Sequence, residues 1–402
     1  MRPHMSKNIV FCADGTWNGP EKDDVGDDSS YNTNVLRLFS ELDGDADTPD
    51  MFLRGEQEKI AKTKSGAVYQ VSKYLHGVGD SNNWLEKIMG GVFGAGMVER
   101  IVRGYTFISR NYSPGDKIYL VGFSRGAYTV RALAGMIGKC GLLDATKYDL
   151  ENNKEDAYRL GTSVWRSYRE HSNVDSNLLD KIIADAPHFL HVDVDPNKML
   201  YFVPIEVVAV WETVGSLGIP KYWDDARVDV YRFTDTSLGE HVKYGRQALA
   251  IDEMRQDFTP TYWDQRNNIV QVLFPGIHAD IGGGYSSVNN GNGLSNAAYL
   301  WMRNELVNLG VKLQPENWVA DFCGQIHCEW YKIKYPLAVR KLKMPISADM
   351  AIHNSAISRI NYPDPLPVQD NKGQWTTQIY RPASLKSFFD SQWKALPNIF
   401  IV

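Results

Sequence analysis

One serine of the sequence has neighbours that are typical of a nucleophile. Ser124 stands in the segment Gly122–Gly126, which reads Gly-Phe-Ser-Arg-Gly and directly follows a β-branched run. A serine on a sharp strand-to-helix turn takes up a strained backbone, and small residues two positions before and after it prevent steric overlap. Gly122 and Gly126 are those small residues here. The pattern predicts that Ser124 attacks an acyl carbonyl carbon.

A nucleophilic serine needs a histidine base, and after such a turn the usual chain order is serine, acid, histidine. Of the nine histidines, His278 is the best placed. It follows an apolar β run and a Pro-Gly pair, so it is expected at the carboxyl end of a strand, where Ser124 must also lie. His191 precedes the acid candidates, and His353 has apolar neighbours typical of a core residue. We therefore predict that His278 is the base.

Three carboxylates could orient the imidazole. Glu212 follows the apolar run Ile205–Trp211, and a carboxylate at the end of a buried strand needs a partner such as an imidazole N–H. Asp280 lies two residues after the histidine and is expected to brace the glycine loop 282–284 instead. Asp252 is expected to take part in an ion pair. Glu212 is the favoured acid, and Asp280 and Asp252 are the alternatives.

The negative charge that develops on the substrate oxygen needs hydrogen-bond donors. The backbone N–H of Arg125 comes at the start of the helix that follows the serine, at its positive end. The first strand ends in Ala-Asp-Gly-Thr, where Asp14 can cap the backbone and Gly15 or Thr16 can offer a second N–H. We expect these backbone groups to form an oxyanion hole.

Short β-branched runs and helical patterns alternate along the chain. The predicted strands are Asn8–Cys12, Lys117–Gly122, Ile205–Trp211 and Ile269–Phe274. The predicted helices are Asn34–Leu42, Met97–Tyr112, Tyr128–Gly138, Tyr158–Arg169 and Leu294–Leu309. Alternation of this kind favours an α/β fold with a mostly parallel sheet and helices on both of its faces. Such a sheet would gather the candidate residues at the carboxyl ends of its strands.

The spacing of the elements predicts a single domain over residues 1–402. An interval at about 140–200 is longer than a strand-to-strand crossover needs, so we interpret it as an insertion that forms a lid or cap. The pattern after Leu309 loses its periodicity and becomes aromatic and proline-rich. We expect residues 310–402 to be an elaboration packed on the same core.

The composition excludes several classes of protein. The chain has 43 Lys and Arg against 48 Asp and Glu, a net charge of −5, which argues against a nucleic-acid partner. Four cysteines without a Cys-x-x-Cys pair argue against a disulfide scaffold, and we expect no metal and no cofactor. No apolar run approaches the roughly 20 residues of a membrane helix, and we see no signal peptide. We expect synthesis in the cytoplasm.

Several motifs in one order resemble a known family. The chain is similar to the α/β-hydrolase family of type VI secretion phospholipase (lipase) effectors, long catalogued as a domain of unknown function. The resemblance covers roughly residues 8 to 310, with weaker similarity at His353–Arg359. The motifs that carry it are Val10–Asn18, Tyr74–Gly79, Gly122–Gly135, Trp211–Gly218, Ala248–Glu253, Phe258–Trp263 and Pro275–Tyr285.

The resemblance implies a Ser-acid-His triad formed by Ser124, Glu212 and His278 and an acyl-enzyme intermediate. The family usually has Asp where this chain has Glu212, which leaves a shifted strand end, another acid or a weakened enzyme as explanations. The resemblance also implies an ester or phospholipid substrate, contact with a membrane surface, a secretion or immunity protein as partner, and export by a type VI system. The alternatives are a soluble esterase or thioesterase for small esters, and a hydrolase fold kept as a binding module with little activity.

Overall fold

The computed structural model describes most of the chain around one large sheet. The described residues are 6–15, 32–46, 56–77, 93–170, 192–213, 238–255, 258–329, 350–396 and 400–402. Within them, ten strands form this sheet, in the spatial order β14 (Phe400–Ile401), β11 (Ala351–Ile352), β10 (Ile269–Phe274), β9 (Val242–Ala250), β8 (Ile205–Thr213), β5 (Lys117–Ser124), β1 (Asn8–Ala13), β4 (Val68–Leu75), β3 (Glu56–Lys62) and β2 (Asp45–Ala46).

The strands from β14 to β4 are parallel, and only β3 and β2 run antiparallel to their neighbours. Every residue of the central strands β1 and β8 is buried. Strands that are covered on both faces favour apolar side chains on both, which is why Ile9–Ala13 of β1 and Val207–Trp211 of β8 are continuous apolar runs. The predicted mostly parallel sheet is confirmed.

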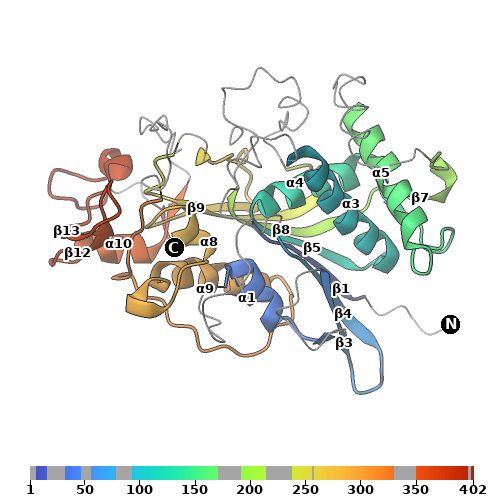
Figure 1. Cartoon of the computed structure of the whole chain (residues 1–402), viewed down its shortest axis with the longest axis horizontal. Coiled ribbons are helices and arrows are strands. Elements are labelled where there is room, and N and C mark those ends of the chain that lie inside the picture. The colour runs from blue at the N-terminus through green and yellow to red at the C-terminus, as the bar shows by residue number, and fades with distance from the viewer. Residues whose placement is uncertain are drawn as a thin grey trace.

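Helices cover both faces of the sheet (Figure 1). Helices α3 (Phe93–Asn111), α4 (Arg125–Cys140) and α5 (Lys154–Glu170) lie together on one face, and α1 (Asn34–Glu41), α8 (His278–Gly282) and α9 (Gly293–Asn308) lie on the other. The remaining elements are small: α10 (Asn354–Asn361), the strand pairs β6 (Leu142–Leu143) with β7 (Met199–Leu200) and β12 (Leu366–Gln369) with β13 (Trp375–Gln378), and 3-10 turns at Pro196–Lys198, Val288–Asn290 and Ala383–Phe388.

The four predicted strands and five predicted helices are all present, with ends that differ by a few residues. Helices α3 and α5 begin four residues before their predicted starts, and α4, which was predicted from Tyr128, begins three residues earlier at Arg125. The helix therefore starts directly after Ser124, so the strand-to-helix turn is tighter than the helical pattern alone predicted.

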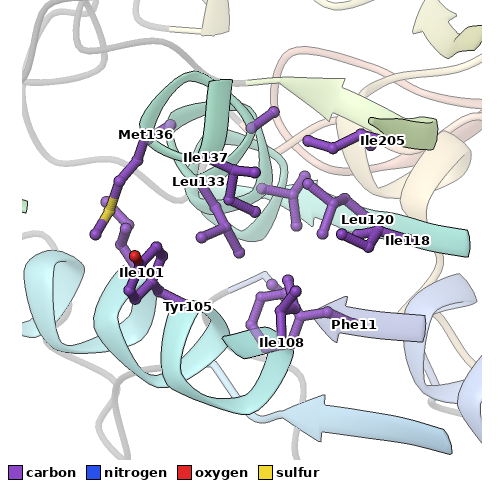
Figure 2. Close-up of a cluster of buried hydrophobic side chains, with 14 of the residues drawn as sticks. Phe11, Ile101, Tyr105, Ile108, Ile118, Leu120, Leu133, Met136, Ile137 and Ile205 are labelled. Carbon is purple, nitrogen blue, oxygen red and sulfur yellow. The ribbon is translucent and has the colours of Figure 1, made fainter. Parts of the chain in front are cut away.

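The core between the sheet and helices α3 and α4 consists of buried apolar side chains. Figure 2 shows Ile101 and Tyr105 of α3 facing Leu133 and Met136 of α4, with Phe11 of β1 to their right. All five of these side chains are buried. A close-packed core of this kind fixes the position of α4, and with it the position of the serine at its start.

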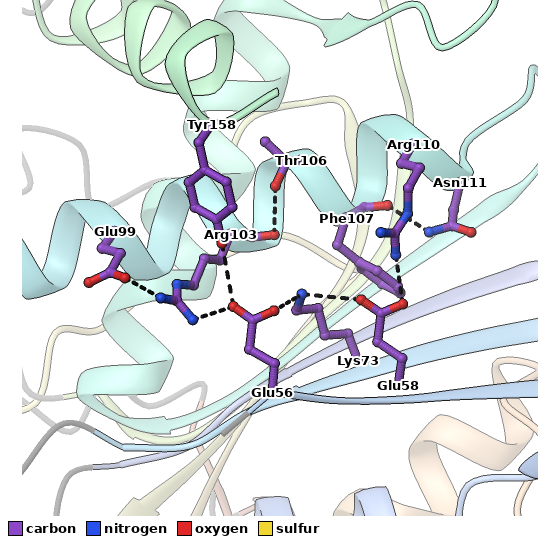
Figure 3. A network of polar contacts seen from close by, with 10 residues as sticks. All are labelled: Glu56, Glu58, Lys73, Glu99, Arg103, Thr106, Phe107, Arg110, Asn111 and Tyr158. Atoms are coloured by element: carbon purple, nitrogen blue, oxygen red, sulfur yellow. Dashed lines mark hydrogen bonds and ion pairs between the residues drawn. The ribbon is translucent and has the colours of Figure 1, made fainter. Parts of the chain in front are cut away.

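The antiparallel edge of the sheet is fixed to α3 by charged side chains (Figure 3). Lys73 of β4 lies between Glu56 and Glu58 of β3, and Arg103 and Arg110 of α3 bind these same two carboxylates. Strand β3, whose outer neighbour is only the two-residue β2, was not predicted, because its Glu-Gln-Glu-Lys-Ile-Ala-Lys sequence has few apolar residues. Alternating charges are an ordinary way to protect an edge strand, and here they also hold α3 in register with the sheet.

Two organisational predictions concern the insertion and the C-terminal elaboration. Within 140–200, the structure describes the β6–β7 pair and α5, which packs against α3, while 171–191 lies outside the described residues. A role as a lid or cap stays a prediction, as does the single domain. In the C-terminal part, β11 and β14 extend the central sheet beyond β10.

Candidate active site

Ser124 occupies the turn between β5 and α4 in a strained conformation. Its φ is 55° and its ψ is −117°, outside the regions that a residue with a side chain normally adopts. Such strain persists only where the surrounding structure enforces it, and it is expected of a serine held clear of its neighbours at the end of a strand. The serine therefore has the backbone geometry that its sequence motif predicts.

The two flanking glycines are required by close backbone contacts. A Cβ atom on Gly122 would lie 2.5 Å from the carbonyl oxygen of Gly126, and a Cβ on Gly126 would overlap the carbonyl oxygen of Ala13. No side chain fits at either position. The two glycines let β5, the start of α4 and the end of β1 approach one another, and this brings the end of β1 next to Ser124.

His278 is the first residue of α8, four residues after the end of β10. Its imidazole is buried between two aromatic rings: the centroid of Phe123 lies 4.7 Å away, and that of Phe258 lies 4.9 Å away in an edge contact. Phe123 is the residue immediately before Ser124. The histidine therefore lies against the turn that carries the serine.

Glu212 contacts the same histidine from β8. Its Oε2 lies 3.4 Å from Nδ1 of His278, and its Oε1 accepts the N–H of Ala250 at 2.6 Å. Glu212 is fully buried, so the carboxylate is held between the imidazole and the end of β9. Of the three carboxylates considered from the sequence, Glu212 has its side chain on the imidazole.

The backbone is irregular at Glu212, the position where the family that the sequence resembles usually has Asp. The register between β5 and β8 shifts between Phe123 and Ser124, so that Ser124 is paired with Thr213 rather than with Glu212. Glu212 has a φ of 43°, which is uncommon for a residue with a side chain. The strand is therefore irregular at the position of the longer side chain, and the three explanations considered from the sequence stay open.

Burial makes the imidazole of His278 a weak base. The pKa of His278 is lowered to about 3, mainly because burial disfavours the charged ring, and next because of the positive charge of Arg255. Glu253 opposes these effects and Arg125 adds to them. The imidazole is consequently neutral at neutral pH, which is the form that can accept a proton.

Asp280 and Asp252 serve other parts of the site. Asp280 accepts the N–H of Ile277 at 3.0 Å and lies 2.6 Å from Nδ1 of His327. It braces the start of α8 rather than the glycine loop 282–284 that follows it. Asp252 accepts the N–H of Gly276 at 2.7 Å and the hydroxyl of Tyr380 at 2.8 Å, and within the described residues it forms no ion pair. Burial raises the pKa of Asp252 to about 6.

Asp14 holds the end of β1 beside the serine. Its buried carboxylate accepts hydrogen bonds from Thr33 Oγ1, the hydroxyl of Tyr74 and the N–H of Gly15, each at 2.6 Å. Burial raises the pKa of Asp14 to about 6, although these hydrogen bonds favour the charged form. The guanidinium of Arg100, from α3, donates to the carbonyl of Asp14. The predicted capping role of Asp14 is confirmed.

Two of the three residues predicted to donate to an oxyanion, Arg125 and Gly15, lie within the described residues. Arg125 is the first residue of α4, as expected, and a Cβ on Gly15 would lie 3.2 Å from Cβ of Ser124, so the Gly15 backbone is at the site. The N–H of Gly15 is, however, taken up by the Asp14 carboxylate. Thr16, the other donor considered, lies outside the described residues.

Sequence reasoning missed a buried pair beside the histidine. Glu253 and Arg255 form a two-pronged ion pair, and Oε2 of Glu253 accepts the backbone N–H of His278 at 3.2 Å. The signal available in the sequence was a carboxylate and a guanidinium two residues apart, directly after a strand. That spacing is common and does not by itself indicate a contact with a residue far along the chain.

The other histidines considered have different surroundings. His353 caps the start of α10, accepts the N–H of Ser355 and stacks on Phe274, so it is a structural residue. His191 lies outside the described residues. The described part of the chain contains no group of three or more His, Cys, Asp or Glu side chains that could hold a metal ion. Likewise, no described helix has the length and apolar character needed to cross a membrane.

Comparison with known proteins gives several relatives. An uncharacterized protein of Saccharomyces cerevisiae, YEL023C, is 28% identical over 254 residues, which cover 63% of this chain and 32% of the yeast protein. The solved structure of the Tle1 effector bound to the VgrG spike of a type 6 secretion system is similar over 70% of this chain and 51% of its own, with 18% identity and a TM-score of 0.37.

A second solved structure, an uncharacterized protein from Pseudomonas aeruginosa, is similar over 77% of this chain and 46% of its own, with 18% identity and a TM-score of 0.41. The chain thus spans between about a third and about half of the length of these relatives.

A family model covers a larger share of the chain. The model of the type VI secretion phospholipase effectors, Tle1-like, catalytic domain, matches residues 7–305. The matched part runs from just before β1 into the last turn of α9 and includes the serine turn, Glu212, the Glu253–Arg255 pair and His278. The chain therefore belongs to the Tle1-like family of type VI secretion phospholipase effectors, of which it contains the catalytic domain.

Proposed function

We propose that the chain is a serine ester hydrolase that cleaves acyl esters of phospholipids. The observation that carries this proposal is the contact of the buried Glu212 carboxylate with His278 beside a serine in a strained strand-to-helix turn. A nucleophile, a neutral base and a buried carboxylate that orients the base are the three parts that acyl transfer by serine requires.

In the proposed reaction, His278 accepts the proton of Ser124 Oγ as that oxygen attacks the ester carbonyl carbon. Because Nδ1 of the imidazole faces Glu212, Nε2 is the nitrogen that takes the proton. The imidazolium returns the proton to the alcohol that leaves, and an acyl-enzyme remains on Ser124. Water, deprotonated by the same imidazole, then attacks the acyl-enzyme and releases the fatty acid.

Glu212 has two tasks in this scheme. Its carboxylate fixes the tautomer of His278 by accepting the Nδ1 proton, and it stabilises the positive charge that the ring carries after it takes the serine proton. The N–H of Ala250 holds the other carboxylate oxygen, so the acid does not need to reorganise during the reaction. A preorganised charge of this kind is worth more in a buried site than in water.

We propose that the oxyanion is held by the N–H of Arg125 and by a second N–H from the loop after β1. Arg125 lies at the N-terminus of α4, where the helix dipole favours negative charge. Since Gly15 donates to Asp14, Thr16 is the better candidate for the second donor. If Gly15 is the donor instead, its N–H must turn away from the Asp14 carboxylate when substrate binds.

Family membership supports a phospholipid as the substrate and a type VI secretion system as the route of export. We propose both for this chain, together with contact with a membrane surface and with a secretion or immunity protein. Export is tested by detecting the chain in the medium of the producing bacterium with and without a working secretion system. Equal amounts in the two cultures would argue against this route.

The experiment for the activity compares the chain with Ser124→Ala on two kinds of substrate. Phospholipid vesicles labelled in the acyl chain and a series of soluble esters of increasing length are incubated with each protein. We expect release of labelled fatty acid by the wild type and none by Ser124→Ala. Ser65→Ala changes an exposed turn serine and is the matched control, with activity equal to the wild type.

Each other outcome has a defined meaning. If the wild type hydrolyses only the short soluble esters, the protein is a small-ester esterase and not a phospholipase. Equal rates for the wild type and Ser124→Ala would contradict the serine mechanism. An inert wild type that is folded by circular dichroism would contradict the proposed activity and favour the binding module.

A further inference from the structure

The most extensive polar structure near His278 that the proposed reaction does not use is the pair formed by Glu253 and Arg255. Nε of Arg255 lies 2.8 Å from Oε1 of Glu253, and Nη2 lies 2.8 Å from Oε2. The backbone N–H of Arg255 also donates to Oε1 at 2.9 Å. Both side chains are buried. A planar guanidinium bound to both oxygens fixes the direction of the carboxylate more firmly than a lysine could.

This carboxylate is connected directly to the histidine. Oε2 of Glu253 accepts the backbone N–H of His278 at 3.2 Å. That N–H belongs to the first residue of α8, and the first N–H groups of a helix have no partner within the helix. Glu253 therefore supplies an acceptor that α8 needs and sets the position of its first residue.

The guanidinium reaches the imidazole by a second path. The central carbon of the Arg255 guanidinium lies 3.5 Å from the centroid of the Phe258 ring, and the edge of that ring packs on the imidazole of His278. Phe123 also packs on the imidazole, with its centroid 4.7 Å away. The pair thus holds the backbone of the histidine through Glu253 and its ring through Arg255 and Phe258.

We propose that the Glu253–Arg255 pair is a positioning unit for His278 that keeps the imidazole in line between Glu212 and Ser124. The inference rests on the proposed function of His278 as the base. It assigns no contact with substrate to either residue of the pair. Loss of the unit is expected to slow the chemical step while substrate binding changes little, because only the alignment of the base is altered.

The unit also sets the charge around the imidazole. The groups that face His278 are Glu212 from β8, Glu253 and Arg255 after β9, and Arg125 from α4, while Asp280 of its own helix binds His327. Arg255 lowers the pKa of His278 and Glu253 raises it. Removal of Arg255 alone would leave the Glu253 carboxylate to stabilise the imidazolium, so the pKa of His278 should rise. Removal of both charges should cancel most of that rise.

The experiment is a double-mutant cycle with Arg255→Met, Glu253→Gln and the double variant. In Arg255→Met we expect the acid limb of the pH profile of kcat/KM to shift toward higher pH by about one unit. In the double variant we expect the acid limb to lie close to its wild-type pH. Its kcat should still be about 10- to 100-fold below that of the wild type, because the positioning unit is absent. KM should stay within about twofold of the wild type throughout.

Arg255→Lys and a distant pair provide the controls. Arg255→Lys keeps the positive charge but lacks the planar guanidinium. Its acid limb should therefore lie at the wild-type pH, while its kcat should lie between those of Arg255→Met and the wild type. Arg246 of β9 and Glu305 of α9 form another ion pair, in the middle of β9. Arg246→Met and Arg246→Met/Glu305→Gln should leave both the limb and kcat unchanged, whatever they do to thermal stability.

The proposal can be separated from the proposed function by titrating His278 directly. Carbon-13 labelling of histidine, with His278→Gln to identify the resonance, gives its pKa by NMR without any turnover. A rise in Arg255→Met that is reversed in the double variant supports the positioning unit even if the chain hydrolyses nothing. An unchanged His278 titration in all variants, or an unchanged kcat in the folded double variant, would overturn it.

Discussion

Glu212 and His278 meet across 66 positions of sequence, with Oε2 of the glutamate 3.4 Å from Nδ1 of the histidine. The second oxygen of the same carboxylate accepts the N–H of Ala250 at 2.6 Å. Both oxygens are therefore engaged, one by the side chain whose orientation matters and one by the backbone of the neighbouring strand. A carboxylate held at both ends cannot turn away from the imidazole without losing a buried hydrogen bond.

The first prediction concerns the length and charge of this side chain. Glu212→Gln keeps the shape of the side chain but can no longer stabilise the imidazolium, so kcat should fall by about 10³- to 10⁴-fold. Glu212→Asp keeps the charge but is one methylene shorter, and the backbone at Glu212, with φ of 43°, positions the longer residue. We expect its kcat to lie between those of the wild type and Glu212→Gln. A Glu212→Asp variant as fast as the wild type would contradict the importance of the shifted strand end.

The second prediction concerns the pH profile of ester hydrolysis. Since the pKa of His278 is lowered to about 3, the base stays deprotonated well below the pH at which a free histidine is half charged. We expect kcat/KM for a soluble ester to stay level from pH 8 down to about pH 5. A fall in kcat/KM near pH 6 would instead report the protonation of Asp14, whose pKa is about 6, and it should be absent in Asp14→Asn. A limb near pH 6.5 that persists in Asp14→Asn would show that the imidazole is not buried as described.

The third prediction concerns the glycine after the serine. Gly126→Ala would force a Cβ into the carbonyl of Ala13, which belongs to the backbone of a buried strand and cannot move aside. We expect a loss of stability of about 3 kcal/mol or more, or no soluble protein, and no reaction of Ser124 with a fluorophosphonate. Gly66→Ala is the control, because φ there is +83° but no atom lies within 4 Å. It should lower stability by only about 1 kcal/mol and leave the labelling unchanged.

The fourth prediction concerns stability and pH. The pKa of Asp252 is raised from 3.8 to about 6 by burial, so the folded state holds the proton more tightly than the unfolded state. Its contribution to stability is complete below pH 3.8 and is lost as the pH rises through 6. We expect the free energy of unfolding of Asp252→Asn, relative to that of the wild type, to increase by about 3 kcal/mol between pH 4 and pH 8. Denaturant unfolding at each pH measures it.

A matched control for Asp252 is available on the surface. Backbone N–H groups of Gln374 and Lys372 lower the pKa of the exposed Asp370, so its contribution has the opposite sign and is lost as the pH falls. Asp370→Asn should therefore show no gain toward pH 8. A gain of similar size in both variants would indicate a general charge effect rather than burial of Asp252.

The parts of the fold that the sequence predicts are those with a local signal. Strands β1, β5, β8 and β10 lie inside the sheet, and most of their residues are apolar, with few exceptions such as Glu206 of β8 and Gln271 of β10. Strand β9 was missed because Gly245, Arg246 and Gln247 interrupt its apolar pattern, although they occupy a nearly buried strand. The reason lies in contacts that are distant in sequence: Arg246 binds Glu305 of α9, and the carboxamide of Gln247 donates to the carbonyl of Thr261.

The candidate site divides in the same way. Ser124 and His278 could be located because glycines mark their turns, and Glu212 because a carboxylate at the end of an apolar run is unusual. The role of Glu253 could not be predicted, because it depends on β9 and β10 being neighbours, which brings residues 25 positions apart into contact. The hydrogen bond of Gly15 to Asp14 is likewise a detail of geometry that no spacing reveals.

The order of strands in the sheet has a consequence for synthesis on the ribosome. Strand β5 lies between β1, made earlier, and β8, made much later. A nascent chain that has just emerged through α4 therefore presents β5 with one edge unpaired and the apolar side chains Tyr119, Val121 and Phe123 without their cover of later residues. We expect such a chain to bind chaperones that recognise exposed apolar strands. In the proposed mechanism such a chain carries its serine before the acid and the base have been made, so we expect no hydrolysis until the nascent chain has passed His278.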